Sequence, residues 1–219
     1  MVEVRYKSKP KDAMSDVNIF YKPASSISHL MLAGTSGWAL KNLPADFPIV
    51  FTSFTLLFGH GILGIIKFTS VEQSNFIRSL YSQTTLLVEC LPIPLLNAEL
   101  FLTAGYNEGF VWSHVFSSMV PFVSQCFLEE STNSIISDLV LVGNLASMMY
   151  FCVMHDPGTW TGGLVMMAAL NKFVFEKVAG RYDVPRSDFS SVGLAFYTMF
   201  ALGALNDTKT FAFFTQIFF

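Results

Sequence analysis

Two acids and an asparagine lie inside one apolar stretch of the chain, residues 80–104: Glu89, Asn97 and Glu99. An acid at the centre of a bilayer costs roughly 2.5 to 3.5 kcal/mol on insertion scales, so intramembrane acids normally face protein or water rather than lipid. Carboxylate and amide groups held in such a place can bind an ion, a proton or a polar substrate. The stretch therefore predicts a polar site inside the membrane.

Pro92 and Pro94 lie between Glu89 and Asn97. Proline has no N–H group and disfavours helical torsion angles in the residue before it, so a helix here is expected to kink or break. The carbonyl groups that lose their donors need other partners, which inside a membrane come from other protein segments or from a water-filled cavity. We therefore predict that this broken span is packed inside other helices.

The same residues also have a structural interpretation. Polar side chains in membrane bundles often hydrogen-bond between helices, at about 0.6 kcal/mol each, without any further role. On a straight helix Glu89 and Glu99 would lie about 80° apart, so only a kink brings them to one face. Both interpretations remain open, and in either case neighbouring spans contribute further candidate residues: Asp138, Asn144, His60 and His114.

Motifs for catalysis and metal binding are missing from the sequence. The four histidines are scattered, and no HExxH motif, GxSxG elbow or phosphate-binding glycine loop occurs. The three cysteines, an odd number, each lie in an apolar run, which predicts inert thiols rather than disulfides or metal ligands. We therefore expect no enzymatic activity, no cofactor and no metal. The lack of a basic stripe predicts no nucleic-acid partner.

Composition predicts the elements that position these residues. Hydrophobic residues make up 52% of the 219 residues and charged residues only 13%, whereas soluble domains contain about 25% charged residues. The sequence therefore predicts an all-α, polytopic integral membrane helical bundle. About seven transmembrane segments are expected, with a proline-broken third span: 23–40, 47–66, 80–104, 110–128, 135–154, 159–178 and 189–205.

Two tails flank the predicted bundle, residues 23–205. Residues 1–22 form a polar tail, whereas residues 206–219 form an apolar tail that is too short to cross a membrane. With seven crossings, all Lys and Arg residues except Lys41 and Lys209 fall on the side of the N-terminus, as the positive-inside rule requires. We therefore predict a cytoplasmic N-terminus. The short spans favour a thin bilayer, such as the endoplasmic reticulum or another internal membrane.

Small residues recur in the first two spans at spacings that let helix backbones approach closely. They are Ala33, Gly37, Gly59, Gly61 and Gly64. We predict that these residues take part in helix packing.

With no catalytic motif and no extramembrane domain, the leading hypothesis for function is a non-enzymatic subunit or scaffold of a larger membrane complex. Its expected partners are membrane lipids and other integral membrane proteins. The alternative is a small transporter or channel with a polar site around the broken third span. A water-accessible cavity that reaches Glu89 or Asn97 would favour transport, whereas a region filled by side chains would favour the subunit.

Overall fold

The computed structural model describes the backbone of residues 13–70, 74–127, 130–155, 159–182 and 184–218. These residues form helices, and no strand occurs among them, which confirms the predicted all-helical class. The described residues of each predicted span fall on a helix or on consecutive helices, and Leu128 of the span 110–128 lies outside the described residues. In chain order they are α1 (Ala13–Asn42), α2 (Pro48–Thr69), α3 (Asn75–Cys90), α4 (Pro92–Thr103), α5 (Glu108–Phe127), α6 (Glu130–His155), α7 (Thr159–Ala169), the π-helix η1 (Leu170–Phe175), α8 (Glu176–Tyr182) and α9 (Arg186–Phe218).

Three helical segments are long and apolar enough to cross a membrane: Pro48–Thr69, Ile135–His155 and Arg186–Thr208. The bent pair of α3 and α4 is a fourth candidate if the two helices together make one span. By length and composition, the described part of the chain thus offers three or four crossings, fewer than the seven predicted. One reason is local, because α7 has only 11 residues before the helix changes to the π-helix η1.

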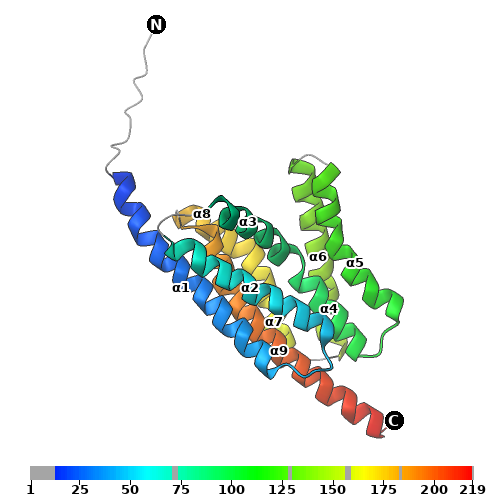
Figure 1. Ribbon diagram of the computed structural model, residues 1–219. Helices are drawn as coiled ribbons and strands as arrows, with labels where there is room; N and C mark the ends of the chain where they lie inside the picture. The colour runs from blue at the N-terminus through cyan, green and yellow to red at the C-terminus, as the bar shows by residue number, and fades with distance from the viewer. Residues whose placement is uncertain (1–12, 71–73, 128–129, 156–158, 183, 219) are drawn as a thin grey trace.

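Two helices are longer than the predicted spans. α1 starts at Ala13 and α9 continues to Phe218, so each includes residues that the sequence placed in a tail. Neither added segment contains glycine or proline, although α1 continues through Pro23, which directly follows its added segment. The added ends extend beyond the rest of the bundle at its opposite ends (Figure 1). Residues 1–12 of the predicted N-terminal tail lie outside the described residues.

α4 lies at the centre of the bundle. It packs against α2, α5, α6 and α9 as well as α3, and every residue from Pro94 to Phe101 is buried. α3 and α4 are separated at Leu91, directly before Pro92, with a bend of 40°. The two halves of the predicted third span therefore follow different directions (Figure 1).

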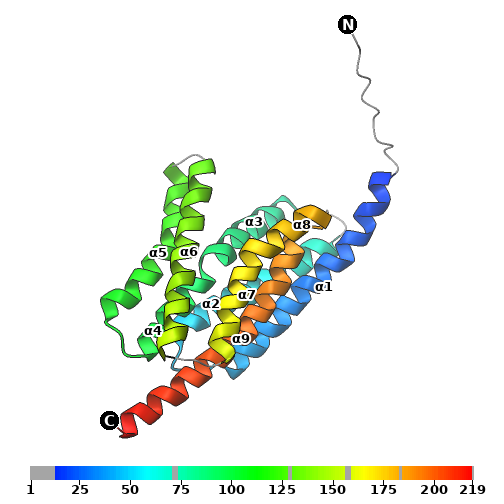
Figure 2. The same ribbon diagram turned by 180° about the vertical axis from the view of Figure 1, so that it is seen from behind.

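The other helices surround this centre in two groups. α1 packs along α2 and α9, and α7 packs along α9 on the side seen in Figure 2. α5 and α6 form a hairpin that contacts α4, and α6 also contacts α7. The outward face of this hairpin carries large exposed apolar side chains, which suit contact with lipid: Trp112, Phe116, Val123, Ile135, Leu139, Met149 and Val153.

The small residues of the first two spans pack α1 against α2. A Cβ atom added at Gly61 would lie 2.8 Å from the backbone nitrogen of Ala33, and one added at Gly64 would overlap a histidine ring of α1. At Gly37 an added Cβ would lie 3.2 Å from a phenylalanine ring of α2. Gly59 differs from the prediction, because a Cβ there would meet open space. The close approach that these glycines allow is therefore between α1 and α2 of the same chain.

Candidate functional site

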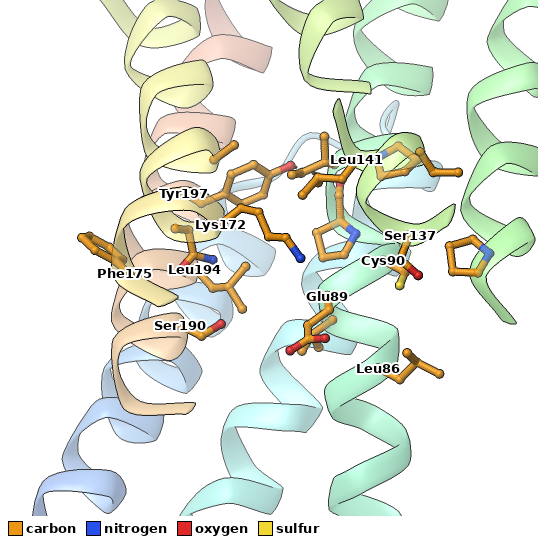
Figure 3. Close-up of a pocket in the computed structure, with 18 of the residues that line it drawn as sticks. Leu86, Glu89, Cys90, Ser137, Leu141, Lys172, Phe175, Ser190, Leu194 and Tyr197 are labelled. Atoms are coloured by element: carbon orange, nitrogen blue, oxygen red, sulfur yellow. Dashed lines mark hydrogen bonds between the residues drawn. The ribbon is translucent and has the colours of Figure 1, made fainter. Parts of the chain in front are cut away.

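A cavity of about 110 Å³ lies at the break between α3 and α4. Its walls come from residues around the break, from one face of α6, from η1 and from the first half of α9 (Figure 3). Most of the lining is apolar, but three charged side chains reach it: Glu89, Lys172 and Arg186. Figure 3 shows Glu89 and Lys172 entering the same space from different helices. A volume of this size has room for several water molecules.

Acid–base pairs balance the charges at this cavity. Lys172 of η1 binds Asp138 of α6, with 2.7 Å between Nζ and Oδ1. Arg186 at the start of α9 faces Glu89 of α3, with 3.9 Å between Nη2 and Oε1. All four side chains keep between 29% and 51% of their surface exposed. Pairs this exposed contribute about 0 to 1 kcal/mol each, so a solute can replace either partner at small cost.

Two prolines shape the backbone side of the cavity. Because Pro92 and Pro94 have no N–H group, the carbonyl groups of Val88 and Cys90 lack the donors that a regular helix would give them. Tyr197 of α9 supplies one hydrogen bond at the break, since its buried hydroxyl donates to the Pro92 carbonyl at 3.1 Å. The hydroxyl points toward the break in Figure 3. A hydrogen bond from α9 thus helps to hold the backbone at the break.

The π-helix η1 carries three residues to the cavity wall, Asn171, Lys172 and Phe175. π-helical turns often mark functional sites. Gly193 of α9 makes room for this turn, because a Cβ atom there would overlap the Asn171 amide. Asn171 Oδ1 is buried and has no hydrogen-bond partner among the described residues. A buried acceptor of this kind normally binds water or a ligand.

Together these groups can hold a small charged or polar molecule. The cavity combines one carboxylate, that of Glu89, and two cations, Lys172 and Arg186, with apolar walls, so each charge of an ion or a zwitterion would meet an opposite charge there. In the part of the chain that the structure describes, no group of three or more His, Cys, Asp and Glu side chains could hold a metal ion.

Asn97 lies in a packed network between α4, α5 and α6 rather than on the cavity wall. Its Nδ2 group donates to the backbone carbonyl of Asn144 at 2.8 Å. Asn144 Oδ1 lies 3.0 Å from His114 Nδ1, and Asn144 Nδ2 donates to Ser117 at 3.1 Å. Asn97 is fully buried. Three predicted residues, Asn97, Asn144 and His114, are therefore brought together, but their side chains form hydrogen bonds between packed helices.

Glu99 has a structural position at the start of α2. Its Oε2 atom accepts the backbone N–H groups of Ile49 and Val50 at 2.8 and 2.9 Å. The first turn of any helix has such unsatisfied donors, and Phe47 at the N-cap position offers no side-chain acceptor. A buried carboxyl group of α4 thus caps α2. The structural interpretation of the intramembrane acids fits Glu99, whereas Glu89 lines the cavity.

His60 belongs to a fourth group of polar residues, between α1, α2, α3 and α9. Its ring stacks on Tyr81 with 4.8 Å between centroids, and its Nδ1 atom lies 2.9 Å from the Thr84 hydroxyl. The ring of His29 lies 5.6 Å from the His60 ring. The predicted residues are therefore divided among the cavity, the Asn97 network, the Glu99 cap and this histidine group.

Sequence reasoning missed several residues of these sites. Lys172 and Arg186 at the cavity were not predicted as site residues, and neither were His29, Tyr81 and Asp188. The contacts join distant segments, since His29 and Tyr81 are 52 positions apart. The one usable signal was Lys172, a cation inside a predicted span that needs an acid such as Asp138 nearby.

A comparison with known protein families matches a range of residues that includes the whole cavity. Residues 44–202 match the family described as Domain of unknown function (DUF4791), and this range contains every residue that lines the cavity. No curated protein and no solved structure shows a significant match. The matched range includes α2 through the first half of α9, which is well over half of the chain, so the chain belongs to the DUF4791 family.

Proposed function

We propose that this chain is a small membrane transporter or channel that binds an ion or a small polar solute in the cavity between α3 and α4. The observation that supports this function is that the cavity reaches Glu89. Transport was the alternative to a complex subunit in the sequence interpretation, and this cavity reverses their order. The proposal includes seven crossings, a cytoplasmic N-terminus, an internal membrane and no enzymatic step.

The broken helix suits this function. In membrane transporters, interrupted helices often place backbone carbonyl groups and helix ends around the bound ion or solute. Here the prolines remove donors from the carbonyls of Val88 and Cys90, and both residues line the cavity. Glu89 and Lys172 add charges of opposite sign at the same place. The cavity therefore offers ligands to a cation, to an anion or to a solute that carries both charges.

Flux into liposomes that contain the purified protein tests the proposal. Fluxes of K⁺, Na⁺, Cl⁻ and H⁺ are measured separately with ion-sensitive dyes. Glu89→Gln and Lys172→Gln should lower the flux by about tenfold or more while the protein stays folded, because each removes a charge that the solute meets. Glu108→Gln and Lys41→Gln are matched controls, since these residues are exposed and lie off the cavity wall. Wild-type flux in both cavity variants would contradict the proposal.

Cys90 gives an independent test of the route, because it lines the cavity whereas Cys152 does not. In a chain that carries Cys126→Ser and Cys152→Ser, a charged water-soluble thiol reagent should label Cys90 and block the flux. Adding Cys90→Ser should remove both the labelling and the block. A Cys90 thiol that stays unlabelled in the folded protein would contradict a water-filled route.

A complex subunit remains the second candidate, and it is favoured by the exposed apolar face of the α5–α6 hairpin. Leu139 and Val153 of α6 each keep 71% of their surface exposed. Such a face suits either lipid or the helix of another membrane protein. Purification in mild detergent distinguishes these occupants. A partner that co-purifies with the wild-type chain and is lost in Leu139→Ser would favour the subunit.

A further inference from the structure

A group of buried titratable side chains lies apart from the cavity, where α1, α2, α3 and α9 meet. His29, His60, Tyr81 and Asp188 each keep less than a tenth of their surface exposed. Ionisable groups are costly at such positions and seldom occur there without a role. The cavity, the Asn97 network and the Glu99 cap do not use them.

Hydrogen bonds define the tautomer of His29. Its Nδ1 atom lies 2.8 Å from the backbone carbonyl oxygen of Ser25, which can only accept, so Nδ1 carries a hydrogen. In the neutral ring, Nε2 is then the acceptor. It lies 2.8 Å from the Tyr81 hydroxyl and 3.3 Å from the Ser191 hydroxyl. Hydroxyl oxygens can also accept, so both would be acceptors for a proton added to Nε2.

The carboxyl group of Asp188 is connected to the His29 ring through one bridging residue, Ser25. Ser25, whose carbonyl accepts from His29, donates its own hydroxyl to Asp188 Oδ2 at 2.8 Å. The negative charge of Asp188 therefore lies where it would compensate a positive charge on His29. The His29 ring fits between the helices because residue 64 is a glycine: a Cβ atom at Gly64 would overlap the ring.

A lysine and a second histidine ring limit the number of protons that this group of residues can bind. Lys67 Nζ lies 3.7 Å from the centroid of the Tyr81 ring, and the His60 ring lies 5.6 Å from the His29 ring. His60 Nδ1 faces the Thr84 oxygen, whose hydrogen is donated to the Tyr81 carbonyl, so His60 is a donor there. A second imidazolium beside the first, with Lys67 close by, would be repelled.

We propose that His29, Tyr81 and Asp188 form a binding site for one proton in the folded protein, with the proton on Nε2 of His29. The site goes beyond the proposed transport function and does not depend on it. It is nevertheless next to the cavity along α9, because Ser190 lines the cavity whereas Ser191 lies beside His29.

NMR of the full chain in lipid bilayers tests this site, with histidine as the only residue type labelled with ¹³C and ¹⁵N. The chain has four histidines, so the His29 ring signal can be identified by its loss in His29→Gln. Loss of the other three ring signals in His60→Gln, His114→Gln and His155→Gln identifies the His29 signal independently in chains that keep His29. Between about pH 8 and pH 5, the His29 signal should change from the neutral Nδ1–H form to the doubly protonated form while the protein stays folded.

Asp188→Asn separates proton binding from packing. Asparagine keeps an oxygen that accepts from Ser25 but removes the charge, so the His29 ring should stay neutral down to about pH 5. Asp207→Asn makes the same change at an exposed position of α9 and should leave the wild-type behaviour unchanged. A His29 ring that stays neutral in the folded wild-type protein, or that becomes charged equally in Asp188→Asn, would overturn the proposal.

Discussion

α3 and α4 come from one predicted span, yet they have opposite environments. Only Tyr81 and Val88 of α3 are buried, whereas α4 is buried continuously from Pro94 to Phe101. At the end of α3, Glu89 keeps 42% of its side chain exposed, while Glu99 on α4 keeps 1%. The same residue type thus lines a cavity on one side of the break and caps a helix on the other. Substitutions in α4 should therefore lower stability, whereas substitutions at the end of α3 should affect function.

The largest expected effect is at Glu99. Glu99→Leu leaves two N–H groups in the first turn of α2 without an acceptor and should lower the free energy of unfolding by about 3 kcal/mol. Glu99→Gln keeps an acceptor oxygen and should cost about 1 kcal/mol or less. Unfolding by SDS in mixed micelles measures both variants. Equal stability of the two would contradict the capping role.

Asn97 should show the next largest effect. Asn97→Ala removes the hydrogen bond that joins α4 to the Asn144 carbonyl of α6 and leaves space at a fully buried position, at an expected cost of about 2 kcal/mol in the free energy of unfolding. Asn206→Ala changes an exposed asparagine of α9 and serves as the control under the same unfolding conditions. If both variants were equally stable, the Asn97 network would not hold α4 to α6.

Tyr197 tests the break itself. Tyr197→Phe removes only the hydroxyl that donates to the Pro92 carbonyl, so stability should fall by about 1 kcal/mol. Tyr182→Phe removes a hydroxyl from an exposed side chain and should be nearly silent. The unfolding midpoints of the two variants are compared, and a Tyr197→Phe variant as stable as the wild type would mean that this hydrogen bond does not stabilise the break.

The smallest expected effect on stability is at Glu89. Its ion pair with Arg186 is long and exposed, so Glu89→Gln should change the free energy of unfolding by less than about 0.5 kcal/mol. The flux measured for the same variant should nevertheless fall as proposed above. A loss of stability as large as that of Glu99→Leu would remove the distinction between α3 and α4.

Parts of this architecture could be predicted because they depend on neighbouring residues alone. Pro92 and Pro94 located the break, since a missing N–H group acts on the turn around it. The positions of the helices followed from apolar runs between polar loops. The number of crossings did not follow equally well, because a helix such as α7, with 11 residues before a π-helix, crosses or fails to cross according to what surrounds it.

By itself, the sequence determined the helical class, the break in the third span and the presence of acids inside an apolar stretch, because each is a property of a short segment. Only the tertiary structure decided the role of each acid. Glu99 meets Ile49 across 50 positions of the chain, and Glu89 meets Arg186 from another helix. A hydrogen bond or a cavity requires groups from distant segments at a defined distance, and a linear pattern of residue types does not contain that distance.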